Sequence, residues 1–127
     1  MKYKLIERVN PANPADPKKW YASPVNAGKF TIKNFAKEIA GRSSLTRGDI
    51  ENVLNNFLDE LPVFLKLGMS VQLGEFGTLR LGISSEGTDT KEQFSAAKIR
   101  NVKIIFTPSS ALKTSLKDDL AFEQEQQ

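Results

Sequence analysis

The 127-residue sequence contains no cysteine and no histidine. Without cysteine, the chain cannot form a disulfide framework or a thiolate metal site. Without histidine, it lacks the commonest metal ligand and the usual general base, which excludes Ser-His-Asp and Cys-His catalytic arrangements. Paired carboxylates such as Asp59-Glu60 are adjacent on expected helices and therefore point to different faces. We expect a protein that is not an enzyme and that uses no cofactor, metal or small-molecule substrate.

Long hydrophobic runs are also missing. No apolar stretch approaches the roughly 20 residues that a membrane-spanning helix needs. The first residues, Met-Lys-Tyr-Lys-Leu-Ile-Glu, are too few and too charged for a signal peptide. We therefore expect a soluble, cytoplasmic protein that does not contact a membrane.

The charge of the chain is moderately basic and unevenly distributed. The net charge is +3 and the isoelectric point is about 9.2. Residues 1–30 carry six cations and two anions, whereas residues 31–68 are balanced. A basic surplus suits an anionic partner, but an ordinary solvated surface explains it equally well. Charge alone therefore does not identify nucleic acid as the partner.

The first thirty residues differ in pattern from the rest of the chain. Three prolines lie between Asn10 and Pro17, which excludes a helix there and predicts a loop. This loop separates residues 3–9 from residues 20–25, and both segments can be extended strands. We expect residues 1–29 to be an extension that docks on the domain that follows.

Two helices are predicted between residues 31 and 68. Apolar residues recur at three- and four-residue spacing from Ile32 to Ala40, which is typical of an amphipathic helix. Thr46 then begins a second helix with a capping-box pattern, and Gly68 ends it. Pro62 lies inside this helix, so we expect a kink or an interruption near residues 59–61. The second helix should bury a wide apolar stripe made of Ile50, Val53, Leu54, Phe57, Leu58, Leu61, Phe64 and Leu65.

Strands and a short helix are predicted after Gly68. Apolar residues alternate over residues 71–73 and 79–83, with a glycine-bracketed turn between them, which predicts a β-hairpin. Residues 84–100 are polar, and a third strand follows with Val102, Ile104 and Phe106 on one face. Pro108 precedes a last helix in which Leu112, Leu116 and Leu120 lie four residues apart. We expect residues 122–127 to be a frayed tail.

This order of elements resembles the HU/IHF family of bacterial histone-like proteins. Residues 71–79, Val-Gln-Leu-Gly-Glu-Phe-Gly-Thr-Leu, look like the family segment that ends in Gly-Phe-Gly-x-Phe. Residues 46–50, Thr-Arg-Gly-Asp-Ile, look like the start of the family's second helix, and residues 104–108, Ile-Ile-Phe-Thr-Pro, look like the segment before its last helix. The resemblance covers about residues 30 to 120, and the first 29 residues resemble an extension found in an HU-like subgroup.

The resemblance implies an α+β fold with a helical hairpin, a three-stranded antiparallel sheet, a protruding β-arm and a C-terminal helix. It places the DNA-binding domain at residues 30–121. It also implies an intertwined homodimer whose arms hold double-stranded DNA through the minor groove. The apolar arc of the second helix favours dimerisation independently, although a monomer that covers these side chains itself is the alternative.

The sequence departs from the family in the parts that contact DNA. The arm corresponds to residues 84–100 and is neutral, because Glu86, Asp89 and Glu92 offset Lys91, Lys98 and Arg100. The Arg-Asn-Pro tip typical of the family is missing. Thr-Pro-Ser-Ser at residues 107–110 replaces the usual Lys-Pro-Gly-Lys. These differences predict modest affinity and leave strong bending of DNA in doubt.

Seven side chains are candidates for contact with DNA. Phe94 is the large aromatic that could open a base step, although packing on the sheet explains it better. The others are cations, of which Arg80 and Lys103 should lie on the open face of the sheet and pair either with phosphate or with Glu75 or Glu86. The full set is Arg80, Lys91, Phe94, Lys98, Arg100, Lys103 and Lys113.

The extension offers further candidates. Lys18, Lys19 and Lys29 can add contacts to the DNA backbone. Trp20 and Tyr21 can stack on bases, but a packed strand explains them better.

Two functions remain open from the sequence. The first is a dimeric, histone-like, nucleoid-associated protein that binds DNA largely without sequence preference. The second is an HU-like dimer that binds protein instead, which the neutral arm, the acidic tail and the added extension favour.

Overall fold

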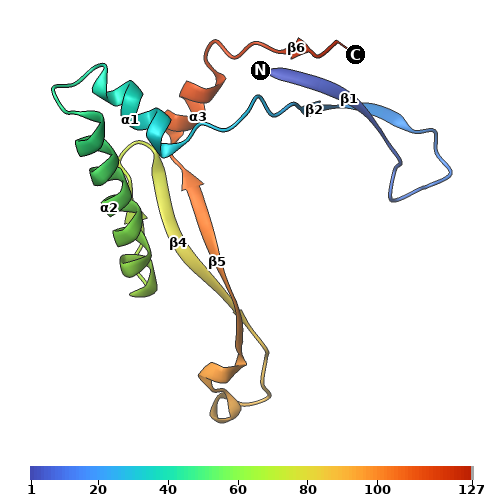
Figure 1. Ribbon diagram of the computed structural model, residues 1–127. Coiled ribbons are helices and arrows are strands. Elements are labelled where there is room, and N and C mark those ends of the chain that lie inside the picture. The colour runs from blue at the N-terminus through green and yellow to red at the C-terminus, as the bar shows by residue number, and fades with distance from the viewer. Residues whose placement is uncertain (127) are drawn as a thin grey trace. The chain divides into compact units, whose positions relative to one another are not determined.

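The computed structural model describes residues 1–126, which form two compact units (Figure 1). Unit 1 combines Met1–Phe30 with residues 116–126, and unit 2 is Thr31–Ser115. Each unit contains one three-stranded sheet. The division differs from the expected one because residues 116–121 group with the extension rather than with the HU-like domain.

Unit 1 is built on a sheet in the order β2-β1-β6. Strands β1 (Lys2–Arg8) and β2 (Lys19–Pro24) pair antiparallel and are joined by the proline-rich loop. The prediction of two extended segments separated by a loop is therefore correct. Strand β6 (Glu123–Gln124) pairs parallel to β1. The expectation of a frayed tail is therefore wrong for these two residues, because main-chain hydrogen bonds to β1 hold them. Residue 127 of that tail lies outside the described residues.

Unit 2 begins with a helical hairpin. Helix α1 (Ile32–Ala40) has a capping box between Thr31 and Asn34, and helix α2 (Arg47–Lys66) begins where the Thr46 hydroxyl accepts from the amide of Asp49 at 3.1 Å. Pro62 lies inside α2, which is continuous from Arg47 to Lys66, so of the two expected outcomes near residues 59–61 an interruption does not occur. No helix within residues 1–126 has the length and apolarity needed to cross a bilayer.

The sheet of unit 2 follows the hairpin in the order β3-β4-β5, with every pairing antiparallel. Strand β3 (Val71–Gln72) is short, whereas β4 (Gly77–Ser85) and β5 (Ile99–Pro108) form a long ribbon. In Figure 1 this ribbon runs away from the helices and ends in the arm. The arm contains two short 3₁₀ turns, η1 (Lys91–Gln93) and η2 (Ala96–Lys98).

The last helix, α3 (Ser110–Lys117), is shorter than the leucine spacing predicts. It ends before Leu120, and both Leu116 and Leu120 are exposed. The prediction of a helix directly after Pro108 is correct, but its expected extension to Leu120 is not.

The core of unit 2 is small. The buried apolar residues among those described are Ala36, Ile50 and Leu65. The expected stripe on α2 is therefore only partly buried, because Val53, Phe57, Leu58 and Phe64 remain exposed. The helical hairpin and the sheet of one chain do not cover the apolar surface that the sequence provides.

Gly77 is needed where β4 begins. Its backbone has a φ of +150°, and an added Cβ would lie 2.5 Å from the Thr107 carbonyl oxygen and 2.6 Å from the Phe106 ring. A side chain there would be strained and would push β5 away. We predict that Gly77→Ala lowers the free energy of unfolding by roughly 2–4 kcal/mol, measured by urea denaturation.

Gly87→Ala is the matched control, because no atom lies within 4 Å of its added Cβ. This variant should change the free energy of unfolding by less than about 0.5 kcal/mol. Equal stability of the two variants would contradict the importance of the close approach at Gly77.

Candidate nucleic-acid interface

The pairing of β4 with β5 fixes which side chains share a face of the sheet. Arg80 lies opposite Ile105, and Gly82 lies opposite Lys103. Side chains directly opposite each other in an antiparallel pair project to the same side, and alternate residues of one strand do so as well. Arg80 and Lys103 are therefore diagonal neighbours on one face, as the alternation of the sequence predicts.

No side chain projects from this face at Gly82, which lies between the two cations. A Cβ at position 82 would lie 2.7 Å from Cδ1 of Ile105 and 3.6 Å from Cγ of Lys103. The missing side chain therefore leaves room for Ile105. Arg80 and Lys103 are both exposed, and neither forms an ion pair with a described residue. The alternative in which they pair with Glu75 or Glu86 does not occur, so both cations are available to an anion.

The opposite face of the ribbon is apolar. Leu79, Leu81 and Ile83 of β4 lie opposite Phe106, Ile104 and Val102 of β5. The predicted apolar face of the sheet is therefore present. Toward the arm its side chains are exposed to solvent, with Ile83, Val102 and Ile104 at 63%, 65% and 69% exposure. The ribbon thus presents a basic face on one side and an uncovered apolar face on the other.

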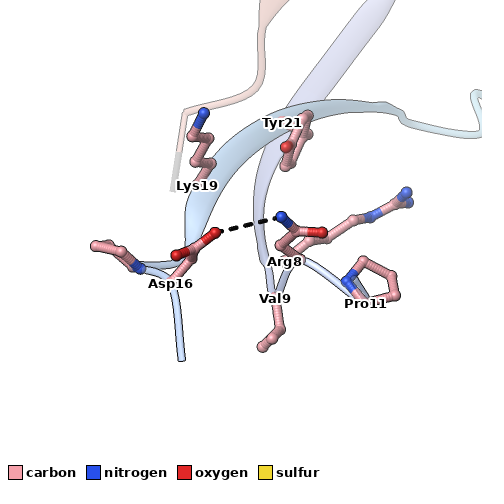
Figure 2. A pocket seen from close by; sticks show the side chains of 8 residues that line it. Arg8, Val9, Pro11, Asp16, Lys19 and Tyr21 are labelled. Carbon is pink, nitrogen blue, oxygen red and sulfur yellow. Dashed lines mark hydrogen bonds between the residues drawn. The ribbon is translucent and has the colours of Figure 1, made fainter. Parts of the chain in front are cut away.

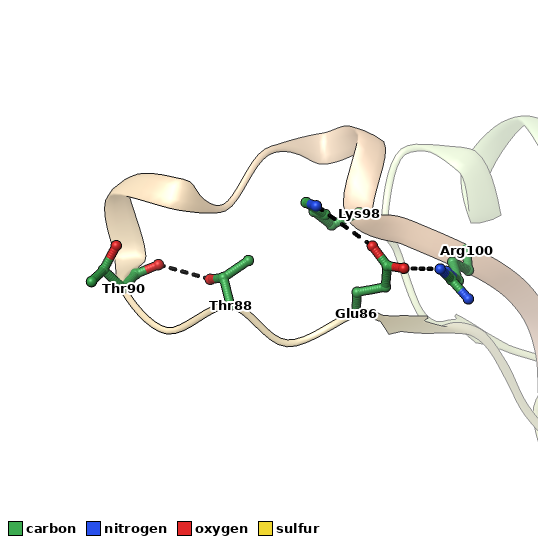
Figure 3. Close-up of polar contacts among 5 residues, drawn as sticks. All are labelled: Glu86, Thr88, Thr90, Lys98 and Arg100. Atoms are coloured by element: carbon green, nitrogen blue, oxygen red, sulfur yellow. Dashed lines mark hydrogen bonds and ion pairs between the residues drawn. The ribbon is translucent and has the colours of Figure 1, made fainter.

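Glu86 engages two of the candidate cations at the base of the arm (Figure 3). Its carboxylate pairs with the Arg100 guanidinium and lies 3.6 Å from Nζ of Lys98. The amide of Glu86 also donates to the carbonyl of Lys98 at 2.9 Å, which holds the two sides of the arm together. The pairs are partly exposed, so solvent screens them and each stabilises the fold only slightly. Their main effect is to reduce the positive charge that the arm presents.

The outer part of the arm carries Lys91 and Phe94. Lys91 is exposed in η1, and its carbonyl accepts from the amide of Phe94 at 3.1 Å. The Phe94 ring is partly exposed and makes no ring contact within the described residues. On the other side of the arm tip, the Thr88 hydroxyl donates to the Thr90 carbonyl at 2.7 Å (Figure 3). The tip therefore contains one main-chain hydrogen bond and one from a side chain to the main chain, and Phe94 is left accessible.

The start of α3 is tied to the turn before β4. The Ser109 hydroxyl donates to the Glu75 carbonyl and accepts from the amide of Leu112 at 3.0 Å. The amide of Ser109 donates to the carbonyl of Phe76 at 3.2 Å. Ser109 is therefore a structural cap here, and its hydroxyl is already bonded. Lys113 is exposed on α3 one turn later.

The structure brings the seven candidates together only in part. Arg80 and Lys103 share a face of the ribbon, and Lys98 and Arg100 share Glu86 at the base of the arm. Sequence reasoning found the neutrality of the arm but not the role of Glu86. The ion pairs of Glu86 could have been predicted from its position. Glu86 directly follows β4 and therefore lies across the ribbon from the start of β5.

The helical hairpin, the three-stranded sheet with its extended ribbon and the helix that follows define an α+β fold of the HU class. A family model described as an HU domain fused to wHTH, Ig, or glycine-rich motif matches residues 1–124. The chain therefore belongs to this HU-HIG family.

Two solved structures share the fold. A crystal structure of a candidate bacterial DNA-binding protein from Bacteroides vulgatus ATCC 8482 is 13% identical, with a TM-score of 0.57 over 98% of this chain. This chain spans 47% of that protein's length. HU from Anabaena, solved in complex with DNA, is 16% identical, with a TM-score of 0.54 over 69% of this chain and 98% of the HU chain. No curated protein matches the sequence.

Proposed function

We propose that the protein is a dimeric, histone-like DNA-binding protein of the bacterial nucleoid that binds the DNA backbone and minor groove largely without sequence preference. The observation that carries this proposal is the pair of exposed cations, Arg80 and Lys103, on one face of an HU-type ribbon. Neither has a carboxylate partner among the described residues. Cations placed in this way neutralise phosphates without reading base identity.

The relatives support DNA as the anion. This chain shares its fold with Anabaena HU, whose structure was solved as a complex with DNA. The arm follows the ribbon in the chain and carries three further cations, Lys91, Lys98 and Arg100, of which Glu86 pairs with the last two. Lys113 would contribute one further contact from α3. We assign Phe94 to the minor groove, where a partly exposed ring at the arm tip can contact an opened base step.

The apolar face of the ribbon supports dimerisation. Ile83, Val102 and Ile104 are more than half exposed, and so is Val53 of α2. Covering the remaining surface of one such side chain gains roughly 1–2 kcal/mol. A second copy of this chain brings the same apolar face and therefore provides a matching cover.

The alternative function is an HU-like dimer that binds protein rather than DNA. The ion pairs of Glu86 favour it, because they occupy two of the three cations of the arm. In this alternative, the arm would be a neutral surface for a protein partner.

Charge reversal on the open face distinguishes the two functions. We predict that Arg80→Glu with Lys103→Glu weakens binding to duplex DNA at least tenfold at low salt and reduces the slope of log K against log salt by about two per chain. The measurement is fluorescence anisotropy with linear, nicked and four-way-junction DNA. Lys37→Glu, which removes an exposed cation of α1, is the control and should have a smaller effect. The absence of wild-type binding to any of these DNAs at low salt would contradict the proposal.

Removal of the Glu86 charge tests the arm. We predict that Glu86→Gln tightens DNA binding and steepens the salt slope by about one to two units, because Lys98 and Arg100 then become available to phosphates. Glu92→Gln removes a charge from the same arm without breaking an ion pair and is the matched control. If both variants bind equally well, the pairing at Glu86 does not limit DNA binding.

Dimerisation is tested on the apolar face. We predict that Ile104→Glu converts the dimer to a monomer at micromolar concentration, because the carboxylate would be buried in the interface without a partner. The neighbouring Lys103→Glu places the same side chain on the opposite face and should leave the dimer intact. Sedimentation velocity measures both outcomes. A wild-type protein that sediments as a monomer would overturn the assignment.

A further inference from the structure

The sheet of unit 1 has one face that is rich in cations. The register of β1 and β2 places Arg8 opposite Lys19, Ile6 opposite Tyr21 and Lys4 opposite Ser23. These side chains project to the same side, and alternation adds Lys2. Glu123 of β6, which pairs in register with Lys2, is an anion on this face. Trp20, Leu5 and Glu7 project from the opposite face.

The pairing of Arg8 with Lys19 is unfavourable in the free protein. Two like charges directly opposite each other on one face of a sheet repel. Neither side chain forms an ion pair with a described residue, and both are exposed. Anions bound to the two cations would reduce the repulsion, so this position favours a ligand with several negative charges.

A pocket of about 340 Å³ lies at this position (Figure 2). Arg8, Lys19 and Tyr21 line it together with prolines of the loop. The Tyr21 side chain is 49% exposed, so its ring offers a surface for stacking. The pocket therefore combines cations that suit a phosphate with an aromatic ring that suits a base.

Asp16 also lines the pocket, but its carboxylate is directed to the loop. One oxygen accepts from Nδ2 of Asn13 at 3.0 Å, and the other accepts from Nδ2 of Asn10 at 3.4 Å. These bonds shape the loop between β1 and β2 and leave the two cations without a carboxylate partner. The charge of the pocket therefore remains positive.

We propose that this face of unit 1 binds a segment of single-stranded DNA, with an unpaired base stacked on Tyr21 and its flanking phosphates held by Arg8 and Lys19. Lys4 lies further along the same face, where it can contact the next phosphate of the DNA backbone. The proposal extends the DNA-binding function proposed above to a second site, and the site is built entirely from unit 1. It gives the extension its own ligand, separate from the duplex held by the ribbon and arm.

The test uses the full chain and a fluorescent oligothymidylate at low salt, with duplex binding measured in parallel. Tyr21→Ala should weaken oligothymidylate binding roughly five- to hundredfold, whereas Tyr21→Phe should retain it because the ring is kept. Trp20→Ala is the matched control, since it removes a neighbouring and more exposed aromatic from the opposite face. Arg8→Gln with Lys19→Gln should weaken binding and reduce its salt dependence without removing a ring.

The outcomes separate this proposal from the proposed function. Loss of oligothymidylate binding in Tyr21→Ala, with duplex binding retained, supports the second site. Equal effects of Tyr21→Ala and Trp20→Ala, or no oligothymidylate binding by the wild type while duplex binds, would overturn the second site alone. Oligothymidylate binding without duplex binding would instead overturn the proposed function and retain the second site. If circular dichroism shows that Tyr21→Ala does not fold, two other variants test the second site. Oligothymidylate binding should be retained in Tyr21→Phe and weakened in Arg8→Gln with Lys19→Gln, and equal binding by these two variants would overturn the second site.

Discussion

The rest of unit 2 depends on one constraint: its own helices and sheet cannot bury all of its apolar side chains. The helical hairpin, the short β3 and the long ribbon bury three apolar residues among those described, and they leave one face of the ribbon bare. A chain with this surface gains stability when a second apolar face packs against it. Pairing of two chains on this face would leave the opposite, basic face open, because alternation along a strand separates the two sets of side chains.

The electrostatics of the ribbon then divide into two parts. Arg80 and Lys103 are free on the open face, with Gly82 keeping the surface between them low. At the base of the arm, Glu86 occupies Lys98 and Arg100. A phosphate would have to compete with this carboxylate for both cations. The arrangement therefore suits weaker and less salt-sensitive binding than a uniformly basic arm would give.

Much of the fold could be predicted from the sequence, because its signals are local. The capping residues Thr31 and Thr46 and the alternation in β4 and β5 locate the helices and the ribbon. The strand β6 within the tail was missed because main-chain pairing with β1 holds it, and such pairing leaves no trace in the side-chain pattern. The pairing of Glu86 and the meeting of Arg8 with Lys19 were also missed, because both depend on the register between two strands, which the pattern within either strand does not determine.

The stoichiometry of the protein on a short duplex tests the central claim most directly, because it depends on both the apolar and the basic face. Native mass spectrometry of the full chain with a duplex of about 20 base pairs measures it, repeated at rising salt. We predict a complex of two chains with one duplex that dissociates into free dimer and DNA as salt increases. A complex of one chain with one duplex, or free dimer without any complex at low salt, would contradict the account.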